Sequence, residues 1–108
     1  MRLDEAAAAF REFVEVVCAL RTPGTGCPWD LEQDHQSLRP YLLEEANEVL
    51  DAIERRDDGS LQEELGDLLL QVVLHAQLAA DRKAFSVTSK RRTSRLGFAS
   101  ASPTACRP

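Results

Sequence analysis

The chain has 108 residues, which is the length of one small domain. Hydrophobic residues make up 44% of it and charged residues 29%, a balance typical of a globular protein rather than a disordered one. The formal net charge of −5 argues against binding to a nucleic acid polymer, which needs a basic surface, but not against a nucleotide bound through a metal ion.

A helix is predicted over residues 3–20, because its apolar residues recur at three- and four-residue spacing and so define one buried face. These residues are Phe10, Phe13, Val14, Val17 and Leu20. Residues 21–28 follow with two prolines and two glycines, which predicts a break without regular structure.

A second helix is predicted from Ser37, as its N-cap, to about Arg56. Its expected core positions are Leu42, Ala46, Val49, Leu50 and Ile53. Residues 57–60 form a short turn, which implies that the next helix returns antiparallel to this one.

The third predicted helix covers residues 61–83, with Ser60 as N-cap and Glu63 at the spacing of a capping box. Its expected core positions are Leu61, Leu65, Leu68, Leu69, Val72 and Ala76. The fold class that follows is an all-α helical bundle, in which an antiparallel hairpin of the second and third helices carries an acidic site. Residues 1–85 form this helical domain, and the basic, Ser-rich tail 86–108 is expected to be poorly ordered.

Two acidic clusters lie on the hairpin, one on each helix. Glu45 and Glu48 are three residues apart, with Glu44 beside them, and Glu64 and Asp67 repeat the spacing on the third helix. Residues three apart share one side of a helix, so folding the hairpin brings the two pairs face to face. Clustered carboxylates without nearby Cys or His suit a hard cation, Mg²⁺ or alternatively Mn²⁺, which also binds substrate phosphates.

A carboxylate that is not engaged in ligation is able to act as a general base, which makes Glu44, Glu45 and Glu48 the candidate catalytic residues. The simpler alternative is that these glutamates form a solvated helix face. A di-iron bundle is disfavoured, because such sites use Glu-x-x-His pairs and neither hairpin helix has one.

Three further residues are candidates for contacting a nucleotide. Trp29 offers an indole for stacking on a base, although it is equally suited to closing the open end of the bundle. Arg39 offers a guanidinium for phosphate. His75 continues the polar stripe of Glu64 and Asp67 and is suited to contact a phosphate or water, or to be a hydrogen-bonded histidine of the interior.

Three blocks of the sequence resemble the MazG nucleoside triphosphate pyrophosphohydrolases. They are the stretch from Cys27 to His35 that begins Cys27-Pro28-Trp29-Asp30, the stretch from Tyr41 to Ile53 that contains Glu44-Glu45-Ala46-Asn47-Glu48, and the stretch Glu63-Glu64-Leu65-Gly66-Asp67 with its continuation to Ala76. The resemblance covers about residues 10–85.

The resemblance implies magnesium-dependent hydrolysis of a nucleoside triphosphate between its α- and β-phosphates, giving the monophosphate and pyrophosphate, in nucleotide housecleaning. It places the metal ligands on Glu45, Glu48, Glu64 and Asp67, with Glu44 as an adjunct. It also implies a homodimer or higher homo-oligomer that completes the fold.

The chain departs from the family pattern after Phe85, where a further helix with a basic motif is expected and a Ser- and Arg-rich stretch stands instead. A second function therefore stays open, that of a catalytically weak or inert helical module that binds nucleotide or dimerises. The three widely spaced cysteines, the acidic N-terminus and the lack of a run of about 18 apolar residues lead us to expect a cytoplasmic protein without a membrane partner.

Overall fold

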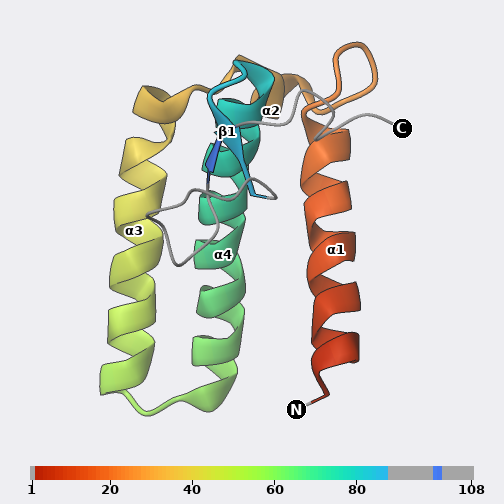
Figure 1. Cartoon of the computed structure of the whole chain (residues 1–108). Helices are drawn as coiled ribbons and strands as arrows, with labels where there is room; N and C mark the ends of the chain where they lie inside the picture. Colours follow the sequence, from red (N-terminus) through yellow and green to blue (C-terminus); the bar gives the residue numbers. More distant parts are fainter. Residues whose placement is uncertain (1, 88–98, 101–108) are drawn as a thin grey trace.

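Three long helices lie side by side, with α4 between α1 and α3 (Figure 1). The computed structural model describes residues 2–87 and 99–100. Helix α1 spans Leu3–Leu20, α3 spans His35–Glu54 and α4 spans Asp58–Asp81. Helix α3 runs antiparallel to both of its companions (Figure 1). The predicted all-α class and the antiparallel hairpin are therefore confirmed for the described residues.

Two short elements lie at the end of the molecule where α3 begins and α4 ends (Figure 1). Helix α2 spans Pro28–Glu32 and starts with proline at its first position, where the missing N–H costs nothing. Residues 21–27 break the helical structure as predicted, whereas the short helix at 28–32 was not predicted. Strand β1 (Phe85–Ser86) pairs antiparallel with β2 (Ala99–Ser100). The prediction of a poorly ordered tail falls mostly on residues outside the described part.

The connection from α1 to α2 is held to α4 by Arg21. Its guanidinium lies 3.0 Å from the carboxylate of Asp81 and also donates to the backbone carbonyl of Asp30. Gly26 is required in this connection, because a Cβ there would collide with the carbonyl oxygens of Leu20 and Thr22. The loop that carries α2 is thus fixed to the body of the fold.

Both hairpin helices begin at an aspartate three residues earlier than predicted. Asp34 caps α3 by accepting from the backbone N–H of Ser37 at 2.7 Å, and the Ser37 hydroxyl accepts from the Asp34 N–H at 2.9 Å. Asp57 caps α4 by accepting from the N–H of Ser60 at 3.1 Å. Ser37 and Ser60 are therefore not the N-caps, because a carboxylate one turn earlier already satisfies their N–H groups.

Residues 55–57 make the turn between α3 and α4. Arg56 has a positive φ of 55° and its N–H donates to the carbonyl of Ile53, while the N–H of Asp57 donates to that of Ala52. These two bonds close the end of α3 as a Schellman motif, with arginine in the position that usually holds glycine. The chain then enters α4 directly, which fixes the antiparallel hairpin.

The core lies where α1, α3 and α4 meet. Its fully buried members are Val17, Leu38, Val73, Leu74 and Leu78. The side chains of Phe13, Val14 and Leu70 pack against them. Val17 and Val49 are buried as predicted, and Ala76 is too.

Several predicted core positions are exposed instead. They are Leu50 and Ile53 on α3, Leu65, Leu69 and Val72 on α4, and Phe10 on α1. The apolar residues of α3 and α4 do lie at helical spacing, but α1 packs mainly on α4, and none of the described residues covers this side of the hairpin.

Within the described part of the chain, no helix has both the length and the apolar character needed to cross a bilayer.

Candidate functional site

The hairpin brings three of the predicted metal ligands together. One carboxylate oxygen from each of Glu45, Glu64 and Asp67 lies within 4.8 Å of the other two. Glu45 comes from α3 and the other two from α4, so the group spans the groove between the helices. The first two are half-buried and Asp67 is exposed. The cluster is therefore open to solvent on one side and walled by the hairpin on the other.

Crowding perturbs the protonation of this group. Burial raises the pKa of Glu45, and the negative charges of Asp67 and Glu64 raise it further. Burial also raises the pKa of Glu64, with the charges of Glu48 and Asp67 acting in the same direction. Carboxylates that raise each other's pKa in this way lack a compensating positive charge.

The protein supplies no such charge from its described residues. Among the ion pairs of residues 2–87 and 99–100, none includes a carboxylate of the two acidic clusters. The Oε2 atom of Glu45 is buried and accepts no hydrogen bond. A buried carboxylate oxygen without a donor is costly, and a bound cation would remove that cost. The all-oxygen donor set fits a hard divalent cation such as Mg²⁺.

Glu44 and Glu48 are exposed on α3 and flank the group of three. The charge of Glu44 contributes to the raised pKa of Glu45, and that of Glu48 to the raised pKa of Glu64. Both carboxylates therefore act electrostatically on Glu45, Glu64 and Asp67, although neither belongs to the group whose oxygen atoms lie within 4.8 Å of one another.

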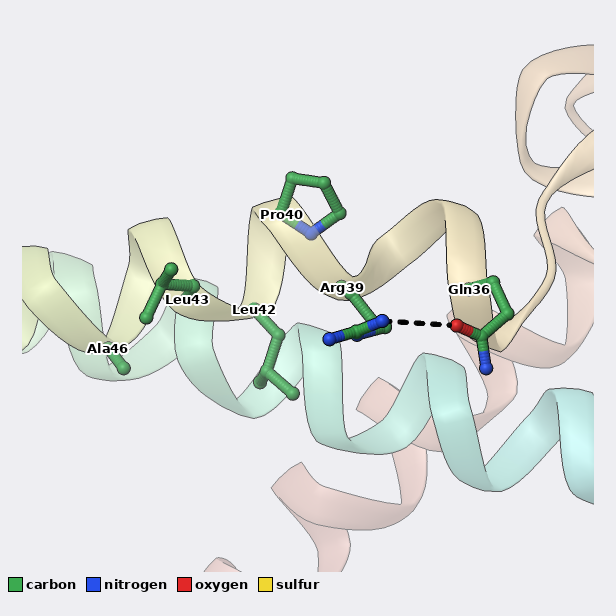
Figure 2. Close-up of a pocket in the computed structure, with 6 residues that line it drawn as sticks. All are labelled: Gln36, Arg39, Pro40, Leu42, Leu43 and Ala46. Carbon is green, nitrogen blue, oxygen red and sulfur yellow. Dashed lines mark hydrogen bonds between the residues drawn. The ribbon is translucent and has the colours of Figure 1, made fainter.

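The residues predicted to contact a nucleotide lie at two different places in the fold. Arg39 lies on α3, six residues before Glu45, which puts it roughly a third of a turn around the helix from that carboxylate. It donates to the side-chain oxygen of Gln36 at 3.3 Å, and both line a shallow hollow with Pro40, Leu42, Leu43 and Ala46 (Figure 2). Trp29 lies on α2, and its ring contacts Tyr41 of α3. That Arg39 and Trp29 bind the nucleotide stays a prediction.

His75 is paired with His35, a contact that the sequence did not suggest. Their Nδ1 atoms lie 2.7 Å apart and the rings are nearly parallel, at 6°. One ring donates and the other accepts, so the neutral pair holds two different tautomers. Burial lowers the pKa of His75, and the adjacent His35 lowers it further.

Gln71 continues the polar stripe of α4, in which Glu64, Asp67, Gln71 and His75 follow one another along one side of the helix. It is 8% exposed, one turn beyond Asp67, and its Oε1 atom has no hydrogen-bond partner among the described residues. No role was predicted for Gln71 itself, and its burial is what the structure adds.

Comparison with known proteins identifies the family of this chain. The family profile described as "MazG nucleotide pyrophosphohydrolase domain" matches residues 33–94. The nucleoside triphosphate pyrophosphohydrolase/pyrophosphatase MazG of Thermotoga maritima is 48% identical over 91 residues, which are 84% of this chain and 35% of that protein.

Two further relatives match shorter stretches. The nucleoside triphosphate pyrophosphohydrolase of Escherichia coli K12 is 56% identical over 66 residues, 61% of this chain and 25% of its own. That of Mycobacterium tuberculosis is 54% identical over 68 residues, 63% of this chain and 20% of its own. The chain thus spans about a third or less of the length of these relatives. Because the profile covers more than half of the chain and includes both acidic clusters, this protein belongs to the MazG nucleotide pyrophosphohydrolase domain family.

Proposed function

We propose that this chain hydrolyses nucleoside triphosphates to the monophosphate and pyrophosphate with the help of Mg²⁺. The observation that carries the proposal is the group of Glu45, Glu64 and Asp67, whose carboxylate oxygens lie within 4.8 Å of one another. The relatives from Thermotoga maritima and Escherichia coli are named as nucleoside triphosphate pyrophosphohydrolases, which supports the same substrate class.

Each carboxylate has a proposed role. Glu45, Glu64 and Asp67 hold the cation, and Glu48 completes the set from the next turn of α3. The bound cation would neutralise phosphate charge and lower the pKa of an attacking water. Glu44 and Glu48 are exposed beside the cluster, where a carboxylate that is not needed for ligation can accept the proton of that water.

The function is tested with a panel of NTPs and dNTPs, each with and without magnesium, with monophosphate and pyrophosphate scored as products. We expect both products in equal amounts and only with the metal. Release of inorganic phosphate and a diphosphate instead would contradict cleavage at the α–β bond. The panel also measures base and sugar preference.

The inert module remains the second candidate, because the matched segment is a small part of each relative. Calorimetry with a non-hydrolysable NTP, run beside the turnover assay, separates the two functions. Binding without turnover would favour the module.

We also propose that the chain forms a homodimer through the exposed apolar stripe of its hairpin. Leu65, Leu69 and Val72 follow one another at helical spacing on α4, as Ala46, Leu50 and Ile53 do on α3. Leu42 of α3 lines two hollows, one with Leu43 and Ala46 of the same helix and one with Val72 and Ala76 of α4. The apolar stripes of α3 and α4 therefore lie on the same side of the hairpin. A contiguous apolar surface of this kind is typical of a protein interface.

A charge placed in this stripe should dissociate the dimer. Sedimentation equilibrium should give twice the 12.0 kDa mass of one chain for the parent protein and the single-chain mass for Leu69→Glu. Leu3→Glu is the control, because Leu3 is exposed at the far end of α1 and lies outside the stripe. An unchanged mass for Leu69→Glu would place the interface elsewhere.

A further inference from the structure

The start of α3 is joined to the last third of α4 by a contact between two histidines. The Nδ1 atoms of His35 and His75 lie 2.7 Å apart, and the two rings are nearly parallel, at 6°. His35 is the first residue of α3, one helical turn before the core residue Leu38. The contact therefore ties the two helices together at the end of the hairpin that lies opposite its turn (Figure 1).

This contact needs one proton between the two Nδ1 atoms. An N–H of one ring has to donate to the lone pair of the other, so the bond exists only while one Nδ1 atom is protonated and the other is bare. In the neutral pair each ring carries one proton, and the ring that accepts at Nδ1 has its proton on Nε2. One added proton enters at the remaining bare Nε2 atom and leaves the contact intact. Two added protons put N–H groups on both Nδ1 atoms, so that two positive rings face each other without a bond.

The surroundings of the pair suit its neutral form. The Nε2 atoms of His35 and His75 are both buried and have no hydrogen-bond partner among the described residues. A charged ring would carry an N–H there that has lost its bonds to water without replacement. Burial lowers the pKa of His75, and His35 lowers it further, which agrees with this picture.

The charged groups of α3 and α4 do not compensate a positive charge on the pair. On α3, the carboxylate of Asp34 caps the helix by accepting from a backbone N–H, and the side chain of Arg39 is itself positive. On α4, Asp67 lies eight residues before His75, about 12 Å along the helix axis. Asp81 lies six residues after His75 and is held in an ion pair.

The other described elements near the pair offer no compensating charge either. Strand β1 has no charged side chain, and it contributes Phe85 to the hollow that His75 lines. The α1 side chains that pack on the core are apolar. Helix α2 carries Asp30 and Glu32, but neither carboxylate contributes to the pKa shift of His75. A doubly protonated pair would therefore stay uncompensated in the closed structure.

We propose that His35 and His75 form an acid-sensitive latch between α3 and α4. The latch is closed while the pair is neutral or has gained one proton, and it opens when both rings are charged. Below the ordinary histidine pKa of about 6.5, the open state binds protons that the closed state cannot hold, so acid shifts the equilibrium toward opening. Opening separates the start of α3 from α4 and leaves the turn at residues 55–57 in place.

Nuclear magnetic resonance of the imidazole nitrogens tests the shared proton directly, because His35 and His75 are the only two histidines of the chain. At about pH 7.5 we expect the two rings together to carry one proton on Nδ1 and one on Nε2, and we expect the rings to titrate as a coupled pair. Protonation of both rings at Nε2 alone, or two independent titrations at the ordinary histidine pKa, would overturn the latch.

Hydrogen exchange measures the opening of the latch. The protection of the backbone amides at residues 38–42 should fall roughly 10- to 100-fold between about pH 7.5 and pH 5.5, the range for uptake of one or two protons at the ordinary histidine pKa. His75→Asn is the matched variant, because its side-chain amide takes the place of Nδ1 and accepts from His35 at either pH. This variant should keep the protection that the parent loses. Amides at residues 50–54, beside the turn, are the internal control and should respond alike in both proteins.

The variants distinguish the latch from a general effect of acid on the fold. An equal loss of protection at residues 38–42 in the parent and in His75→Asn would show that acid acts elsewhere, and the latch would be wrong. His35→Asn places the amide on the other side of the contact and should behave as His75→Asn does, so it replaces that variant if His75→Asn does not fold. If neither variant folds, the titration of the two rings in the parent protein decides alone.

Discussion

Replacing Glu45 by glutamine should reduce magnesium-dependent pyrophosphate release by more than the roughly 10- to 100-fold typical of residues that merely support a metal ligand. Glu45 is the carboxylate that α3 contributes to the group of Glu45, Glu64 and Asp67. Its buried Oε2 atom accepts no hydrogen bond from the described residues. Steady-state assays of pyrophosphate release at several magnesium concentrations measure the effect. An activity equal to that of the parent would remove Glu45 from the ligand set.

The same variant should be at least as stable as the parent when no metal is present. The raised pKa of Glu45 means that the folded protein binds the proton of this group more tightly than the unfolded chain does. At neutral pH the charged carboxylate therefore opposes folding, and a neutral amide removes that opposition. Unimpaired stability separates the loss of activity from misfolding.

Magnesium should stabilise the parent protein but not Glu45→Gln. A hundredfold excess over its dissociation constant stabilises a binding protein by about 2.7 kcal/mol, which raises the melting temperature of a domain this size on the order of 10 °C. Thermal scans should show that rise for the parent and not for Glu45→Gln. Glu54→Gln is the control, because it removes the same charge from the exposed end of α3 and should behave as the parent does.

Leu38→Ala should have the largest effect on stability, a loss of about 2–5 kcal/mol in the free energy of unfolding. Leu38 is 1% exposed and is the α3 residue in the cluster that joins Val17 of α1 to Leu74 of α4. The total stability of a typical domain is only about 5–15 kcal/mol, so the variant should be close to unfolding. Urea denaturation followed by circular dichroism measures the change.

The matched control is Leu3→Ala, the same substitution at a residue that is 78% exposed. It should change the free energy of unfolding by no more than about 0.5 kcal/mol. Equal losses for the two variants would mean that Leu38 does not hold the three helices together.

The three long helices were predictable because each has apolar residues at helical spacing, a signal that is local in sequence. The starts of α3 and α4 were misplaced because serine and aspartate are both good caps, and only the hydrogen bonds show that Asp34 and Asp57 hold that position. Helix α2 was missed because it is a single short turn directly after a stretch rich in proline and glycine, and so few residues show no periodicity.

Burial and pairing were harder to predict than helices. Spacing identifies an apolar stripe but not what covers it, so Leu50 and Leu69 were assigned to the core although they are exposed in one chain. The group of Glu45, Glu64 and Asp67 was predictable because the hairpin turn is short. The contact of His35 with His75 was not, because it depends on how the start of α3 packs on the end of α4, forty residues away.

The hairpin also affects how the protein folds. All three clustered carboxylates come from residues 45–67, a continuous stretch joined by the turn at residues 55–57. Closing so short a loop costs little chain entropy, and helix pairs with such local contacts are among the fastest structures to form. The repulsion between the carboxylates is therefore already present when the first tertiary contacts form. We therefore expect charge in this site to change the rate at which the chain folds, and not only the stability of the finished structure.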